Sequence, residues 1–504
     1  MNHEGHEGHE GKENMEYWSI GVLEYWGFKR PLLHYSITPL LLGWVLAASS
    51  WLAGCMLGPD YKRPTTEIPA QFRAAMTSDA TASIADLKWF EVFQDEYLQE
   101  LIRVALVQNY DLRDAIARVD AARANLGITR SNQFPQFGVG ADVPSRELSR
   151  QGEFTIPQGT SRQRTYGEVF LNLFTFEIDI WGRLRRATES AQAQLFAADW
   201  NRKAVITTLI SDVATAYFNL LDLDTELGIA RNTLGTRQES LRLLRTQLGG
   251  GVGTLLDVRQ GEQLVYTAAE IIPDDERQIE QTENLISFLL GKNPGPISRA
   301  SLLTAQQTPP EVPAGLTSAL LERRPDIQAA EQILIAANAN IGVAKAAYFP
   351  TITLTGEFGF QSTALSNLFA GSRRMWNFIP QITQPIFTAG RIRSQVEFAE
   401  AQQQSALAQY EGAIQTAFRD VSDALIQYQK IREIRAQREL LVSALRDRTR
   451  LAYLRFRGGV DTMLNALNSD QDLFVAELNL AQSRRNELLS LVQLYKALGG
   501  GWQE

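Results

Sequence analysis

Apolar residues in the last quarter of the chain recur at alternating steps of three and four. They are Leu407, Tyr410, Ile414, Phe418, Val421, Leu425 and Tyr428. This spacing predicts a long helix over residues 391–457 with a narrow coiled-coil-like seam. The polar side of this helix carries Gln402, Gln403, Gln409, Gln415, Gln427 and Gln437. No proline occurs over 158–272 or 386–504, and proline costs ~3 kcal/mol inside a helix. The sequence therefore predicts two long helical hairpins.

A second pattern, with a period of two, lies upstream of each predicted hairpin. Polar and apolar residues alternate over 351–360 and 376–386, and again over 170–180, with a weaker strand near 137–143. Such alternation is typical of strands with one polar and one apolar face. Each half of the chain thus supplies a strand pair followed by a helical hairpin.

The two halves are copies of one unit. Gly182 and Thr254 recur as Gly390 and Thr462, 208 positions later, whereas residues further upstream, such as those at 134–135, recur 215 positions later. A period this long exceeds the roughly 20 to 50 residues of solenoid repeats. We place the seven missing residues between the paired strands, at 145–164 and 362–374, because loops tolerate changes in length. The predicted divisions are residues 1–54, a signal peptide, 55–300, an N-terminal segment with the first repeat, and 301–504, the second repeat.

Residues 1–54 have the form of a signal peptide. Lys29 and Arg30 precede an apolar stretch over 37–51, which runs into small residues and Cys55. A charged flank, an apolar core and small residues at the cleavage site define such segments. The ending at 52–55 resembles the bacterial lipoprotein signal, which implies that Cys55 is lipidated and becomes the mature N-terminus. The alternative is a membrane-anchoring helix, but the stretch is shorter than the ~20 residues of a span.

Two details of this region refine the prediction. Residues 1–14 repeat His-Glu-Gly and precede Met15; we interpret them as a misassigned start rather than a metal-binding tract. Met56 follows the cysteine. An aspartate there commonly retains lipoproteins in the inner membrane, so its absence points to the outer membrane.

Composition narrows the range of functions. The net charge is −8 over 504 residues, which offers no basic face for nucleic acid. The single cysteine excludes an intrachain disulfide, and all four histidines precede it. Nucleophilic and metal chemistry therefore lack their usual groups in the mature chain, and we expect no enzyme, cofactor or metal. Asp274, Asp275 and Glu276 could serve as acid and base, but we interpret them as solvated surface.

Each long helix is predicted to end at a glycine cluster, at residues 248–254 and 456–462. Glycine adopts the left-handed conformation that ends a helix, and Thr254 and Thr462 can cap the next one. Two helix-turn-helix tips result. A phosphate cradle is the competing interpretation, but neither cluster has the P-loop lysine or a preceding strand.

The strand count bears on assembly. The amphipathic strands, the signal peptide and the lack of a 20-residue apolar helix after Cys55 favour a transmembrane barrel over a soluble sandwich. Membrane barrels begin at about eight strands, so four strands from one chain cannot close one. We expect a mainly α protein with β structure that forms a homotrimer, in which a twelve-stranded β-barrel joins an α-helical barrel.

Four segments carry a family resemblance and lie at 58–61, 177–183, 385–391 and 494–502. With the duplication, they make the chain similar to the outer membrane efflux proteins of the TolC and OprM type, especially the NodT-like lipoprotein subgroup. The resemblance implies a homotrimeric exit duct, lipid-anchored in the outer membrane and extending into the periplasm. Its partners would be a periplasmic adaptor, or membrane fusion protein, and an inner-membrane RND-type transporter.

The resemblance also implies sites at the two tips. The implied adaptor contacts are Gly251, Val252, Gly253, Thr254, Gly459, Val460, Asp461 and Thr462. The implied periplasmic constriction comprises Leu464, Asn468 and Gln471. Asn468 stands where relatives commonly have aspartate and Gln471 where they commonly have a basic residue, so a gate of charged pairs does not carry over.

Three acids lie near the second tip. We interpret Asp461, Asp470 and Asp472 as solvated helix-end residues, with mutual repulsion in a trimer as the alternative. The main functional interpretation is a passive exit duct for small molecules. An exit duct for type I protein secretion and a structural coiled-coil envelope lipoprotein are alternatives, and the second does not explain the strands. The sequence does not indicate the cargo.

Overall fold

The computed structural model describes residues 56–66, 68–69, 72–73, 83–151, 155–299, 302–306 and 317–502. They all belong to one of two compact units, Gly54–Glu504. The predicted signal peptide, with residues 1–14, and Cys55 lie outside the described residues.

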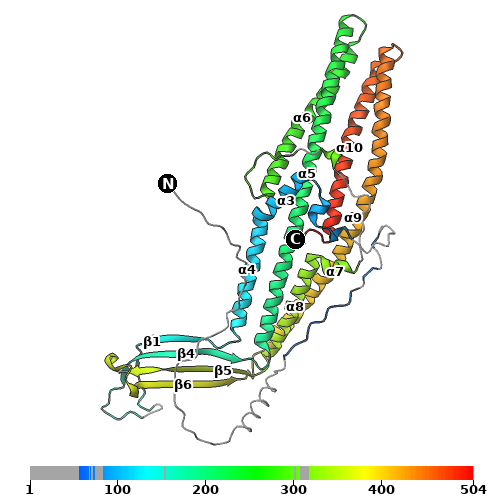
Figure 1. Ribbon diagram of the computed structural model, residues 1–504. Coiled ribbons are helices and arrows are strands. Elements are labelled where there is room, and N and C mark those ends of the chain that lie inside the picture. The colour runs from blue at the N-terminus through cyan, green and yellow to red at the C-terminus, as the bar shows by residue number, and fades with distance from the viewer. Residues whose placement is uncertain are drawn as a thin grey trace, which may run out of the picture. The chain divides into compact units, whose positions relative to one another are not determined.

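The same series of three helices occurs twice, with equal lengths of 22, 67 and 35 residues in each copy. The first series is α4 (Tyr110–Ser131), α5 (Arg183–Gly249) and α6 (Leu255–Leu289), and the second is α8 (Pro325–Ala346), α9 (Arg391–Arg457) and α10 (Met463–Ala497). Shorter helices are α2 (Trp89–Val92), α3 (Glu96–Gln108) and α7 (Ala319–Arg323). The predicted duplication is confirmed in these helices (Figure 1).

The predicted seam of α9 is confirmed. Tyr410, Ile414 and Val421 are buried in the main hydrophobic cluster, while the seam residues Leu407 and Phe418 pack against it partly buried. In the first hairpin, α6 continues through Pro273, beyond the proline-free range. Pro273 is exposed, so water can satisfy the carbonyl that loses its N–H partner.

One helix bears on the expected lack of a 20-residue apolar helix. Helix α5 contains an 18-residue window that is apolar and long enough to cross a membrane. In this window 61% of the residues are buried inside the protein. The window is therefore apolar because α5 lies in the core.

Four strands form one antiparallel sheet in the order β1-β4-β5-β6. Their bounds are β1 (Phe137–Asp142), β4 (Gly167–Ile178), β5 (Thr351–Ser362) and β6 (Arg374–Thr383). Pairing of β4 with β5 joins the strand pair of one copy to that of the other. The predicted last strand was too long, since β6 ends before Pro385 and leaves Ile386 96% exposed.

The register places apolar residues of neighbouring strands beside one another. Ile352 pairs with Ile382 and Phe358 with Trp376, whereas polar Glu357 pairs with Asn377. Opposite residues on adjacent strands share a face. Much of the apolar face is uncovered: Trp376 is 76% and Ile382 70% exposed.

The two copies differ in the connections at one end of the sheet. The β1–β4 connection contains a small hairpin of β2 (Ser145–Glu147) and β3 (Gln163–Thr165). The β5–β6 connection has two short 3-10 turns instead, Leu365–Asn367 and Gly371–Arg373. The difference in length between the two copies thus falls in the loops where the sequence predicted it.

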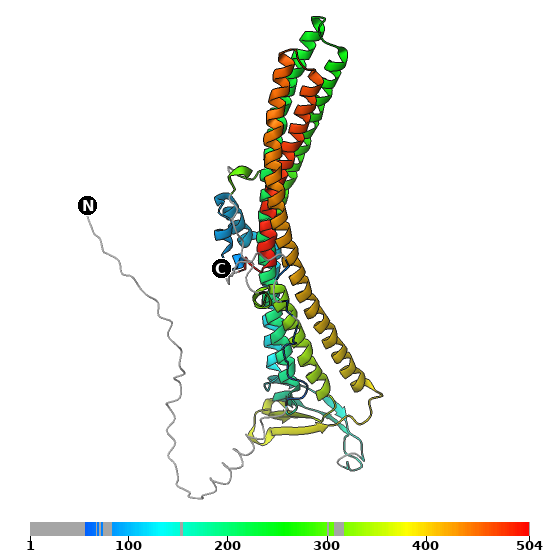
Figure 2. The ribbon, with the colours of Figure 1, turned by 90° about the vertical axis from the view of Figure 1, so that its right-hand side faces the viewer.

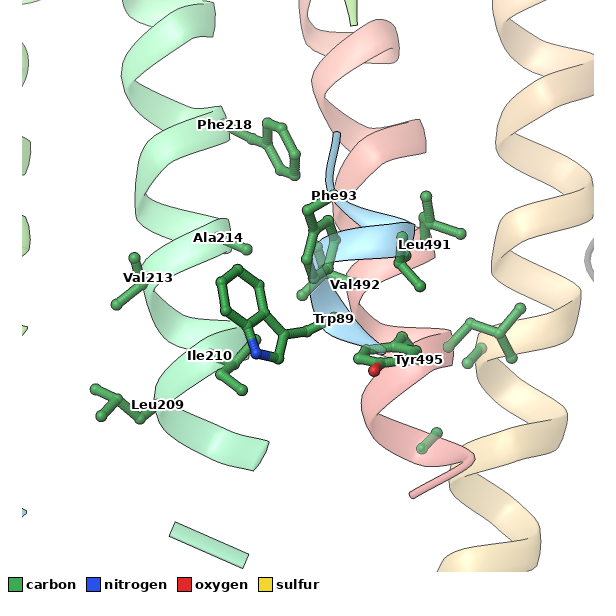
Figure 3. Packing of buried hydrophobic residues seen from close by; sticks show 14 of the residues in the cluster. Trp89, Phe93, Leu209, Ile210, Val213, Ala214, Phe218, Leu491, Val492 and Tyr495 are labelled. Carbon is green, nitrogen blue, oxygen red and sulfur yellow. The ribbon is translucent and has the colours of Figure 1, made fainter. Parts of the chain in front are cut away.

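A core cluster ties the N-terminal segment to both copies (Figure 3). Trp89 and Phe93 pack between Ile210 of α5 and Tyr495 of α10. The Phe93 and Tyr495 rings meet edge to face with centroids 5.9 Å apart, and the Tyr495 hydroxyl donates to Leu87 O at 2.8 Å.

Candidate functional sites

The α5–α6 turn is closed by backbone hydrogen bonds and a threonine cap. The amides of Val252 and Gly253 donate to Gln247 O at 3.0 and 3.1 Å, and Gly251 has a φ of +75°. Thr254 accepts from the amide of Asp257, whose carboxylate accepts from the amide of Thr254 in return. This reciprocal box fixes the start of α6, and Val252 is left 82% exposed at the tip.

The α9–α10 turn has the same backbone path but a different cap. Gly459 has a φ of +72°, and Val460 N donates to Arg455 O at 3.1 Å. The prediction that Thr462 caps α10 was wrong, because its side chain makes no capping bond. The Asp461 carboxylate accepts instead from Asn465 Nδ2 at 2.6 Å, Arg455 Nε at 3.0 Å and Thr462 N at 2.8 Å. These bonds lower the pKa of Asp461, the one from Asn465 most.

Both turns lie at the end of the helices far from the sheet (Figures 1 and 2). The predicted constriction residues follow the second turn on α10. Leu464 and Asn468 are exposed, and with Gln471 they occupy positions four and three residues apart, which share one helix face. Gln471 is half-buried and accepts from Arg237 Nη2 at 2.9 Å.

Arg237 of α5 joins three helices beside this face, and the sequence did not single it out. Its Nε donates to Asp470 of α10 at 2.7 Å, and its Nη1 donates to Leu264 O of α6 at 2.8 Å. The guanidinium lies 4.8 Å from the Phe474 ring centroid. The Arg237 side chain is 1% exposed. It holds the second hairpin against the first.

The interpretation of three acids near the turn as solvated was wrong for Asp470. It is buried against Arg237, and burial raises its pKa. Asp461 pairs with Arg455, and Asp472 pairs with Arg448 at 2.8 Å. Each acid has a cationic partner within the chain.

A buried acidic cluster lies further along the first hairpin. Asp222 is 0% and Asp275 3% exposed, and Arg485 of α10 pairs with Asp222 at 2.8 Å. Asp222 Oδ1, Glu226 Oε1 and Asp275 Oδ2 have no hydrogen-bond donor among the described residues. Burial raises the pKa of Asp222 to about 7 against the opposing effect of Arg485, and burial and Glu226 raise that of Asp275 to about 6.

This cluster corrects a second sequence interpretation. Of the three acids after Pro273, Asp274 and Glu276 are exposed and paired with Arg277 and Arg231. Asp275 instead points into the hairpin. Among the described residues, no group of three or more His, Cys, Asp or Glu side chains has an arrangement that could hold a metal ion.

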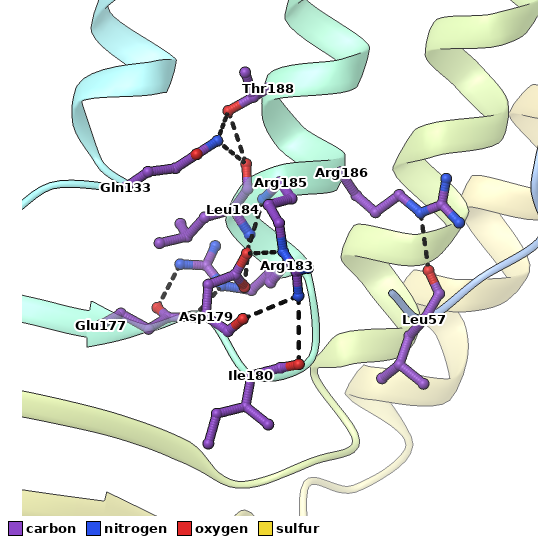
Figure 4. A network of polar contacts seen from close by, with 10 residues as sticks. All are labelled: Leu57, Gln133, Glu177, Asp179, Ile180, Arg183, Leu184, Arg185, Arg186 and Thr188. Atoms are coloured by element: carbon purple, nitrogen blue, oxygen red, sulfur yellow. Dashed lines mark hydrogen bonds and ion pairs between the residues drawn. The ribbon is translucent and has the colours of Figure 1, made fainter. Parts of the chain in front are cut away.

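The segment 177–183 forms the junction between β4 and α5 (Figure 4). Asp179 accepts from the amides of Leu184 and Arg185 at 3.0 and 2.9 Å, so its carboxylate caps the N-terminus of α5. Arg183 donates two bonds to Glu177, at 2.9 and 2.5 Å. The carboxylates therefore fix the direction in which the helix leaves the sheet.

The sequence model for outer membrane efflux proteins matches residues 101–292 and 316–500, well over half of the chain. The chain belongs to the outer membrane efflux protein family. It is 37% identical over 481 residues to the toluene efflux pump outer membrane protein TtgC of Pseudomonas putida, covering 94% of this chain and 96% of TtgC. It is 34% identical over 457 residues to the cation efflux system protein CusC of Escherichia coli, covering 90% and 97%.

Solved structures agree with this membership. The open-state outer membrane channel MtrE of Neisseria gonorrhoeae superposes with a TM-score of 0.81 at 32% identity, covering 89% of this chain and 99% of MtrE. The expected mainly helical fold with a small strand component is confirmed. As an efflux family member the chain is an outer membrane component of an efflux pump that extends into the periplasm. The family is one of ducts rather than enzymes.

Proposed function

We propose that three copies of this chain close into a passive exit duct for small molecules across the outer membrane and periplasm. The observation that carries the proposal is the four-stranded sheet, whose edge strands β1 and β6 each have only one neighbour among the described strands. Membrane barrels need about eight strands or more, and unpaired edges are excluded from lipid. Pairing of β6 with β1 of the next chain would give three chains a closed barrel of twelve strands.

The two helical turns are our proposed docking points for the periplasmic adaptor. Both present an exposed valine, Val252 at 82% and Val460 at 67%, on a backbone turn closed by hydrogen bonds. The proposed contacts remain Gly251 to Thr254 and Gly459 to Thr462. The inner-membrane partner proposed from the family resemblance is an RND-type transporter, which would supply the energy that a passive duct lacks.

The constriction is proposed to be formed by Leu464, Asn468 and Gln471. Leu464 and Asn468 are uncharged and exposed on one face of α10, and Gln471 is fixed by Arg237. Closure would then depend on the position of α10 rather than on charged pairs across the duct.

Lipidation of Cys55 is supported by the position of the residues that follow it. Leu57 N donates to Trp181 O at 3.1 Å. Arg186 Nε donates to Leu57 O at 3.1 Å (Figure 4). A Cβ on Gly58 would lie 2.5 Å from Gly342 Cα, so the backbones are in close contact. The chain after Cys55 is thus held at the sheet-to-helix junction, where a lipid on Cys55 would reach the membrane.

The test is conductance of purified protein in planar lipid bilayers, with its mass measured by light scattering in detergent. Trimers that give discrete conductance steps are expected. Correct trimers that leave the bilayer silent would overturn the duct. Discrete steps from monomers would overturn the proposed assembly.

A further inference from the structure

The connections β1–β4 and β5–β6 lie at the end of the sheet away from the helices. Helices α4 and α8 lead into β1 and β5, and β4 and β6 lead out to α5 and α9. All four junctions with helices therefore lie at one end, and the two connections at the other (Figure 1). With the helices in the periplasm, the connections face the outside of the cell.

This outer end is basic in an acidic chain. Residues 143–166 contain Arg146, Arg150, Arg162 and Arg164, against the acids Glu147 and Glu153, the latter outside the described residues. Residues 363–374 add two arginines, at 373 and 374, and no acid. The whole chain has a net charge of −8, so the arginines at this end are a local feature.

Two of these arginines are paired across the small hairpin. Arg146 of β2 lies directly opposite Arg164 of β3, and like charges in that position destabilise a strand pair. Arg162 forms an ion pair with Glu147, and the Arg146 guanidinium lies 5.3 Å from the Tyr166 ring centroid. The side chain of Arg164 has no hydrogen bond or ion pair within the described residues.

We propose that this arginine face, defined by Arg146, Arg162 and Arg164, binds the phosphorylated sugar headgroups of an outer-leaflet glycolipid. Guanidinium groups bind phosphate oxygens through two parallel hydrogen bonds, and a bound phosphate would offset the repulsion of Arg146 and Arg164. The hairpin connects the outer ends of β1 and β4 directly, so its arginines would lie at the level of the lipid headgroups. Tyr166 suits that level because its ring is apolar and its hydroxyl polar.

The inference depends on the proposed function only for the direction in which the hairpin faces. In the proposed trimer, β6 of one chain adjoins β1 of the next. Arg373 and Arg374 of one chain would then lie near the β2–β3 hairpin of its neighbour. A headgroup with two phosphates could then contact the hairpin arginines of one chain with one phosphate and Arg373 or Arg374 of the neighbouring chain with the other.

The experiment titrates full-length protein in detergent with diphosphoryl lipid A in mixed micelles and measures binding by thermophoresis. The test variant is R146Q/R164Q. The matched control is R123Q/R450Q, which removes two charges from exposed helical arginines paired with Asp120 and Asp447. We expect the test variant to bind about tenfold more weakly, the control to bind normally, and wild-type binding to weaken with added salt.

Several outcomes would overturn the proposal. The first is unchanged lipid A binding by R146Q/R164Q, and the second is equally tight binding of lipid A stripped of its phosphates. The third is displacement of lipid A by inorganic phosphate at the same concentration as the lipid. The fourth is binding of heparin but not of lipid A. Conductance is measured on the same preparations. Normal conductance without lipid selectivity refutes this inference alone, whereas a silent bilayer refutes the proposed function.

Discussion

Arg237 and Asp470 lie 233 residues apart and meet through a 2.7 Å hydrogen bond between buried side chains. The bond joins α5 of the first copy to α10 of the second, next to the exposed face of Leu464 and Asn468. In this protein a buried pair between the hairpins, rather than a charge in the duct, fixes the proposed constriction helix.

Removing one partner of this pair should destabilise the protein. Arg237→Met leaves Asp470 buried and unpaired, which typically costs about 3–5 kcal/mol, so the thermal unfolding midpoint should fall. R237M/D470L should regain part of the loss because no buried charge remains. The control Arg448→Gln breaks an exposed pair within the second hairpin and should cost about 0–1 kcal/mol. Equal midpoints for R237M and R448Q would contradict the role of Arg237.

The acidic cluster predicts a pH-dependent stability. The folded pKa of Asp222, about 7, is above its ordinary value of 3.8, so the folded state binds more protons and loses stability as pH rises between these values. Asp222→Asn should therefore stabilise the protein by about 1–3 kcal/mol at pH 8 and by much less near pH 4. Thermal unfolding across this range measures the effect.

Asp274→Asn is the control for this prediction. Asp274 is exposed, and hydrogen bonds from Arg277 lower its pKa, so its substitution should give no gain at high pH. A gain by D222N that is the same at every pH would show that the Asp222 charge is not the cause. Both variants keep Glu226, Asp275 and Arg485, the charged neighbours of Asp222, so these groups do not differ between the two measurements.

The proposed adaptor contact can be tested at the exposed valines. Val252→Lys and Val460→Lys together should sharply reduce crosslinking of the adaptor to the turns, because a charged chain replaces an apolar contact. Val107→Lys on α3 is the matched control, since Val107 is 75% exposed and lies away from the turns. Both variants should remain trimeric with normal conductance. Full crosslinking by V252K/V460K would remove the turns from the docking site.

The predicted lipid anchor is tested by Cys55→Ser. Cells grown with labelled palmitate should transfer label to the wild-type protein and not to the variant, because serine has no thiol to carry the lipid. A variant that still incorporates palmitate would refute lipidation at Cys55.

Features set by local sequence patterns were predicted well, whereas features that depend on long-range contacts were not. The seam spacing and the glycine at 458 are short-range signals, and the bounds of α9 matched them. The bond between Arg237 and Asp470 depends on how two hairpins pack, which no local pattern encodes. Asp275 was wrongly interpreted as solvated for a related reason, because its burial depends on the rotation of α6 against α5. The expected cap is absent because the Thr462 hydroxyl makes no bond to the first amides of α10, while Asp461, one residue earlier, binds the Thr462 amide and the Asn465 side chain.

The two turns share one backbone path but differ in their caps, since Thr254 closes the first and the Asp461 carboxylate closes the second. In the proposed trimer, turns with and without an aspartate at this position would alternate around the periplasmic rim. The rim would then have threefold rather than sixfold symmetry. A ring of six identical adaptor molecules could not bind it in six equivalent ways, so neighbouring adaptors would have to adopt two different contacts.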